Sequence, residues 1–199
     1  MRYIEKDFYN GKKLMTSLLL ILILLGVSFG VWLVCNKSDW KYLYNPIVTQ
    51  GFIKNFSQKT ILDIFLSSFT WTTLMLGLIY LCGYSAISHI VNLGVIFFRG
   101  VALGISISST YIEHHSKGIL IYLLVMMFHT VVSSTVMVFA TMDSLWQSNN
   151  IASTIMGHSS EMFRLKRYNL KFLVYVIIIA LSSIVDTCLL YLFADRLYY

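Results

Sequence analysis

Long apolar segments separated by short polar ones dominate this sequence. A helix needs about 20 apolar residues to cross the hydrocarbon core of a bilayer. Five segments reach that length, at residues 14–35, 61–82, 86–109, 119–141 and 171–194. Backbone groups in hydrocarbon must satisfy their own hydrogen bonds, so each segment is expected to be a helix. The pattern predicts an all-α fold, a single polytopic membrane helix bundle over residues 1–199 with about five transmembrane helices.

Composition supports an integral membrane protein. The chain is 57% hydrophobic and 12% charged, whereas soluble domains are about 45–50% apolar and about 25% charged. Its single proline suits long helices, because proline removes a backbone donor and clashes with the preceding turn. The apolar segment 14–35 is longer than the hydrophobic part of a signal peptide and lacks a small-x-small cleavage site. We therefore expect it to remain as a transmembrane helix.

The positive charge of the chain indicates an orientation in the membrane. The net charge is +6, but the basic residues flank apolar segments and form no continuous stripe, so no nucleic-acid partner is expected. Basic flanks favour the cytoplasmic side and attract anionic lipid. The two densest basic groups, at residues 2–13 and 164–171, fall on one side if four spans separate them. This predicts a cytoplasmic amino terminus.

The second and third segments are separated only by Gly83-Tyr84-Ser85. A glycine-containing break of this length predicts a tight helix hairpin. The alternative is that residues 86–112 re-enter the membrane, with a break near Arg99-Gly100. Both readings stay open at the level of sequence.

A few polar residues lie inside the apolar segments, and they are the candidate site. Residues 64–112 carry one formal charge, Arg99, and an intramembrane arginine costs from roughly 3 kcal/mol upward. Counting helical rise from the inner end of each span puts Arg99 about 19 Å deep and Asp186 about 22 Å deep. We therefore expect an Arg99–Asp186 ion pair, serving either helix packing or the binding of a partner, ion or peptide. The other intramembrane polar residues are His89, Asn92 and His129.

Glycines at helical spacing predict close helix packing. Gly26-x-x-x-Gly30 and Gly100-x-x-x-Gly104 both have the small-x-x-x-small form that lets helices approach closely. Packing within the chain is the expected use. The adjacent residues Glu113-His114-His115 cannot easily converge on one metal ion, so no metal site is expected there. The sequence also lacks HExxH, GxSxG and phosphate-binding motifs, so no catalytic residues and no cofactor are expected.

The middle of the chain resembles the stage II sporulation protein M family. The resemblance rests on Gly83-Tyr84-Ser85-Ala86, on the core Arg99-Gly100-Val101-Ala102-Leu103-Gly104, and on Lys117-Gly118 before another span. It covers residues 60–141 well and the remainder by span pattern. It implies a five-span protein of the bacterial cytoplasmic membrane with no enzymatic activity. It also implies a packing role for the core residues of the motif.

The resemblance implies several alternative roles. One is a scaffold that recruits a peptidoglycan-hydrolase complex to the septum during engulfment. Another is a membrane subunit for maturation, export or immunity of a circular bacteriocin, and a third is a subunit beside an ABC transporter. A scaffold would act through its helix faces. A transport subunit would use Asn92, Arg99 and Asp186 to line a polar path.

Overall fold

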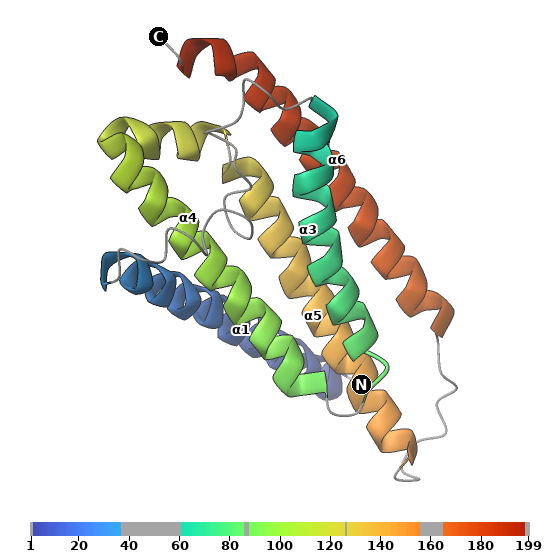
Figure 1. Cartoon of the computed structure of the whole chain (residues 1–199). Coiled ribbons are helices and arrows are strands. Elements are labelled where there is room, and N and C mark those ends of the chain that lie inside the picture. The colour runs from blue at the N-terminus through green and yellow to red at the C-terminus, as the bar shows by residue number, and fades with distance from the viewer. Residues whose placement is uncertain (1, 37–60, 86–87, 126, 156–164, 198–199) are drawn as a thin grey trace.

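The chain folds into long α-helices arranged as a bundle (Figure 1). The computed structural model describes residues 2–36, 61–85, 88–125, 127–155 and 165–197. Those residues form five helices and no strand. The helices are α1 (Arg2–Asn36), α3 (Ile61–Cys82), α4 (Ser88–Val125), α5 (Met127–Ile155) and α6 (Leu165–Leu197). The predicted all-helical membrane bundle is confirmed.

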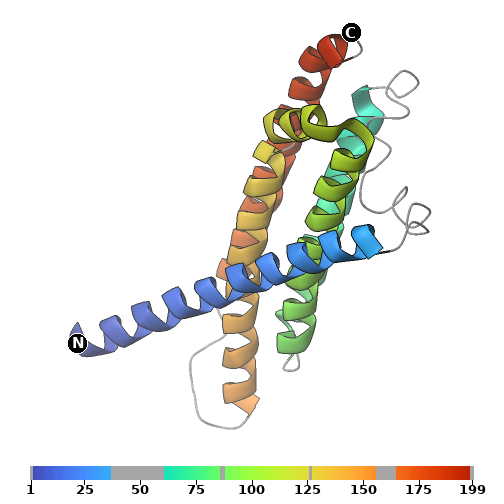
Figure 2. The same cartoon turned by 90° about the vertical axis from the view of Figure 1, so that its left-hand side faces the viewer.

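The axes of α3, α4, α5 and α6 are roughly aligned with one another, and α1 lies across them. Successive helices from α3 to α6 run in opposite directions, with α5 between α4 and α6 (Figure 1). Helix α1 crosses the outside of the bundle obliquely and packs chiefly against α4 (Figure 2). The carboxyl-terminal part of α4 turns over one end of the bundle.

Three helices of the described part of the chain are long and apolar enough to cross a membrane. Their apolar stretches are Lys13–Asn36, His89–Ser109 and Lys166–Leu189. A shorter apolar stretch, Ser68–Cys82, lies in α3. The predicted segment 61–82 has the same bounds as α3, and 86–109 corresponds to the first part of α4.

The predicted segment 119–141 is wrong as a single helix. It covers the end of α4 and the start of α5, which are separate helices. Residues 142–155 continue α5 beyond the predicted end of this segment at residue 141. The error arose because α5 buries serines and threonines, so an average of hydropathy places its boundaries poorly. Residues 37–60 and 156–164 lie outside the described residues.

Helix α4 is continuous through Arg99 and Gly100, so the re-entrant break predicted as an alternative is absent. The short connection after α3 stays close to that helix. The Gly83 amide donates to the Ile79 and Tyr80 carbonyls, and the Ser85 amide donates to the Cys82 carbonyl at 3.0 Å. The hairpin reading fits this geometry.

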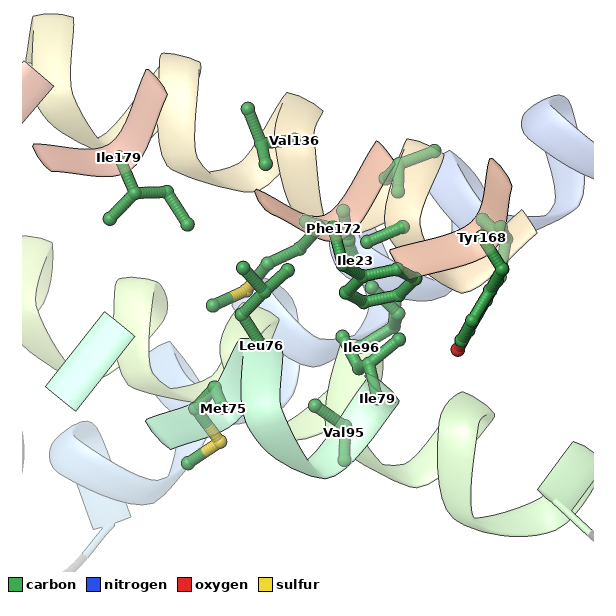
Figure 3. Close-up of a cluster of buried hydrophobic side chains, with 14 residues drawn as sticks. Ile23, Met75, Leu76, Ile79, Val95, Ile96, Val136, Tyr168, Phe172 and Ile179 are labelled. Atoms are coloured by element: carbon green, nitrogen blue, oxygen red, sulfur yellow. The ribbon is translucent and has the colours of Figure 1, made fainter. Parts of the chain in front are cut away.

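An apolar core occupies the middle of the bundle (Figure 3). Leu76 and Ile79 of α3 meet Ile96 of α4 there, and each of the three is almost completely buried. Met137 of α5 and Ile179 of α6 belong to the same cluster. Figure 3 shows Ile179 at one end of this core and Tyr168 at the other.

Two glycine pairs hold α1 against α4. A Cβ atom added to Gly26 would lie 2.5 Å from the Phe97 carbonyl oxygen and 3.0 Å from the Gly100 Cα. A Cβ on Gly100 would collide with the Ile23 carbonyl, and one on Gly104 with the Val27 carbonyl. The two small-x-x-x-small motifs therefore meet each other within one chain, backbone against backbone.

Candidate functional site

Polar side chains line the face of α5 that is turned into the bundle. His129, Ser133, Thr141, Ser144 and Ser148 are all buried, and Ser133, Thr141, Ser144 and Ser148 have no exposed surface. Their spacing of three, four, seven and eight residues places them along one side of a helix. Polar groups in an apolar interior need hydrogen-bond partners, so this face determines how the neighbouring helices lie.

One polar layer is built around Arg99. The arginine is 9% exposed, and its Nη2 donates to Ser133 Oγ of α5 at 2.6 Å. Ser133 in turn donates to the Thr130 carbonyl at 3.2 Å. One turn of α5 away from Ser133, His129 lies near Arg99. We call Ser68, Arg99, His129, Ser133 and Ser182 the arginine layer.

His129 joins three helices within the arginine layer. Its Nδ1 lies 3.0 Å from Ser182 Oγ of α6, and its Nε2 lies 3.3 Å from Ser68 Oγ of α3. Because Ser182 donates its one hydroxyl proton to the Ile179 carbonyl, it accepts from Nδ1 of the neutral imidazole, and Nε2 accepts from the Ser68 hydroxyl. The histidine is thus a polar bridge between α3 and α6 through α5.

The predicted Arg99–Asp186 ion pair does not form between these described residues. Arg99 bonds Ser133 instead, and Lys171 with Asp143 is the ion pair found in the described part of the chain. Asp186 is 3% exposed, and its Oδ1 makes no hydrogen bond there. It lies one helical turn beyond Ser182, so it sits further along the bundle than Arg99.

A second polar layer lies nearer the α3–α4 connection. Asn92 has no exposed surface, and its Nδ2 donates to Ser144 Oγ at 2.9 Å. Ser144 passes the hydrogen bond on to the Ile79 carbonyl at 2.9 Å, and Ser148 donates to the Ser85 carbonyl at 2.7 Å. Tyr168 donates to the Tyr80 carbonyl at 2.9 Å. We call Asn92, Ser144, Ser148 and Tyr168 the asparagine layer.

The two polar layers are separated by the apolar core. Asn92 and Arg99 share a face of α4, as their spacing of seven residues predicts, but Val95 and Ile96 lie between them and belong to the core. On α5, Met137 of the core lies between Ser133 and Thr141. The predicted intramembrane residues are therefore distributed over two levels instead of gathering in one site.

The remaining predicted residues occupy different places. His89 is partly exposed near the start of α4. Gly83 is buried against Tyr168, where an added Cβ would lie 2.7 Å from the ring carbon Cζ. The side chains of residues 113–115 lie outside what the structure describes. Among the described residues, no group of three or more His, Cys, Asp or Glu side chains could hold a metal ion.

The sequence reading missed the hydroxyl partners of these residues. The partners are Ser68, Ser133, Ser144 and Ser182, and none of them is among the predicted site residues. The signal that could have found them is the helical spacing of polar residues on α5, starting at His129.

Comparison with protein-family models identifies the family of this chain. The family model described as Stage II sporulation protein M matches residues 19–190. The chain belongs to the stage II sporulation protein M family. The match takes in all of α3, α4 and α5, with both polar layers and both glycine motifs. Comparison with curated proteins gave no match, and neither did comparison with solved structures.

Membership of the stage II sporulation protein M family confirms the resemblance seen around Arg99-Gly100. It also agrees with the apolar helices in indicating a membrane protein. Within this family member, Gly100 and Gly104 hold α1, while Arg99 on the same stretch of α4 reaches α5. The core motif thus connects three helices at one level of the bundle.

Proposed function

We propose that this family member is a non-enzymatic scaffold of the bacterial cytoplasmic membrane. It would assemble other membrane proteins, with a peptidoglycan-hydrolase complex at the septum as the partner that family membership suggests. The observation that carries the proposal is how the buried polar groups are used. Arg99, His129 and Asn92 each form a hydrogen bond with a serine side chain of a neighbouring helix. Such contacts serve to fix helices relative to one another.

The division of polar groups into two layers supports the same proposal. A subunit that conducts a polar substrate needs polar side chains along its path. Here Val95, Ile96 and Met137 of the apolar core separate Asn92 from Arg99. The scaffold would present outer helix faces to partners, and those faces carry exposed leucines and isoleucines on α1, α4 and α6.

One observation favours a second candidate, a subunit for bacteriocin export or immunity or for an ABC transporter. Asp186 is a buried carboxyl whose Oδ1 makes no hydrogen bond within the described residues. Buried ionisable groups in membrane helices often mark ion or substrate sites. In this reading Asp186, His129 and Arg99 would act together on a transported cation or peptide.

The Asp186→Leu variant distinguishes the two functions, because it removes the buried carboxyl that favours the second candidate and leaves the Arg99–Ser133 contact in place. It would be expressed in a strain lacking the native gene, with helical content and purification yield checked first. The scaffold function predicts that the folded variant still captures its partners in crosslinked, gently solubilised membranes, and still complements the deletion. A transport subunit should lose activity although it folds and assembles.

The partner experiment also tests the scaffold directly. Crosslinking in intact cells, followed by purification and mass spectrometry, should recover a cell-wall hydrolase or its membrane anchor in near-stoichiometric amounts. Recovery of an ATPase or a bacteriocin precursor would instead support the second candidate. If the intact protein were isolated without any membrane-protein partner, the scaffold function would be wrong.

A further inference from the structure

A cluster of tyrosines joins α3 to the beginning of α6. Tyr80 and Tyr84 lie one turn apart, with 2.8 Å between their hydroxyl oxygens. Both hydroxyls donate to Asn169 Oδ1 of α6, at 3.1 Å and 2.8 Å. Tyr168 stacks on Tyr80 with ring centroids 5.5 Å apart. The amide of Asn169 is therefore held in a fixed orientation by a rigid aromatic support.

The hydrogen bonds to Asn169 decide which of its atoms face outward. Its carbonyl oxygen is occupied by the two phenols, so its Nδ2 is directed away from them on an exposed residue. Desolvation raises the pKa of Tyr84 to about 12 from 10.0. The Tyr84 phenol consequently stays protonated at neutral pH and keeps donating to Asn169.

Positive charge lies beside this amide, and no acid of the described residues pairs with it. Lys166 and Arg167 are exposed at the start of α6, and neither forms an ion pair within the described part of the chain. The nearby acid Asp143 is already engaged, by Lys171 at 2.5 Å and by the Tyr175 hydroxyl at 2.7 Å. The surface near Asn169 is thus an electropositive donor surface.

An apolar stripe continues from this surface along α6. Lys166, Asn169, Leu170, Leu173 and Ile177 follow helical spacing, so they share one side of the helix. Leu170 is 67% exposed and Leu173 is 59% exposed. The apolar stretch that can cross a membrane begins at Lys166, which puts the cation and the amide at the water interface. Tyrosines are enriched at that depth of membrane proteins.

We propose that Lys166, Asn169 and the adjoining leucines form a binding site for one anionic phospholipid. Phosphate oxygens of the headgroup accept hydrogen bonds from the Lys166 ammonium and the Asn169 amide, and Arg167 adds positive charge. An acyl chain lies along Leu170 and Leu173. This site is independent of the scaffold function, because it requires only that α6 be embedded in a bilayer.

The test uses the purified full chain in detergent with equal amounts of dioleoylphosphatidylglycerol and dioleoylphosphatidylcholine, with bound lipid counted by native mass spectrometry. The wild type should retain the phosphatidylglycerol preferentially. Lys166→Gln should weaken that binding about fivefold, as expected for loss of one interfacial cation. Asn169→Asp should weaken it at least as much, because the carboxylate still accepts from both tyrosines but repels the phosphate.

Lys13→Gln is the matched control, since Lys13 is an exposed lysine at the start of the apolar stretch of α1, a helix that packs chiefly against α4. It should leave the retained phosphatidylglycerol unchanged, and inorganic phosphate should not displace the lipid. Equal retention of both lipids by the wild type would overturn the proposal. So would equal losses in Lys13→Gln and Lys166→Gln, or displacement by phosphate. Because Lys166 is exposed and makes no hydrogen bond within the described residues, its variant remains informative if Asn169→Asp fails to fold.

Discussion

Arg99 of α4 donates a 2.6 Å hydrogen bond to Ser133 of α5. A charged donor strengthens such a bond, and burial makes its loss costly because water cannot replace the partner. The contact therefore fixes α4 against α5 at the level of the family's core motif.

Replacing Ser133 with alanine should destabilise the bundle by about 1–2 kcal/mol, the range expected for a hydrogen bond to a charge between membrane helices. The adjacent Ser134 provides the control, because its buried Oγ makes no hydrogen bond within the described residues. Ser134→Ala should leave stability unchanged or slightly higher. Unfolding of both variants in mixed micelles measures the difference, and equal effects would contradict the importance of the Arg99 contact.

Replacing Asp186 with leucine should leave the purified protein as stable as the wild type or more stable. The variant removes a buried carboxyl whose Oδ1 is unbonded within the described residues. If Asp186 instead balanced the charge of Arg99, its removal would cost about 3–5 kcal/mol. The midpoint of thermal unfolding in detergent separates these outcomes. A large loss of stability would restore the ion pair that the sequence suggested.

Replacing Gly100 with alanine should cost about 1–3 kcal/mol and loosen α1, because the new Cβ meets the Ile23 carbonyl and lies 3.1 Å from the Gly26 Cα. Gly94 lies on the same helix and has no atom within 4 Å of an added Cβ. Gly94→Ala should therefore gain up to about 1 kcal/mol from reduced backbone entropy in the unfolded chain. Protease accessibility of α1 and thermal unfolding report both effects.

Replacing Gly83 with alanine should destabilise the α3–α4 hairpin by about 1–3 kcal/mol, since the added Cβ lies 2.7 Å from Tyr168 Cζ. Tyr168→Leu in the same chain should recover part of that loss by removing the ring. The two changes should thus be non-additive in a double-mutant cycle. Additive effects would show that the close approach of Gly83 and Tyr168 is unimportant.

Apolar length and glycine spacing were enough to predict the helical bundle. The segment 61–82 reproduced the bounds of α3, because the polar sequence on both sides stops the apolar pattern sharply. Spacing of four residues identified Gly100 and Gly104 as packing positions, and both lie against α1. The sequence could not identify which helix they would meet.

The pairing of polar residues could not be predicted from depth alone. Helix α6 begins at Leu165, six residues before the predicted 171, and this moves Asp186 about 9 Å further from the helix start. The serine residues that bond Arg99 and His129 could not be predicted from the sequence either. Ser133 and Ser182 both bond carbonyls of their own helices, at 3.2 Å and 3.0 Å, which lowers their cost in an apolar segment.

The contact between α1 and α4 has an evolutionary consequence. Backbone atoms of α1 and α4 meet at the glycines, so the contact between the two helices does not depend on the identity of the outward side chains of α1. Leu18, Leu25 and Trp32 are exposed there and are free to drift among apolar residues. Gly26, Gly30, Gly100 and Gly104 cannot drift, since any side chain separates the helices. Aligned relatives should keep these four glycines while the outward residues of α1 diverge.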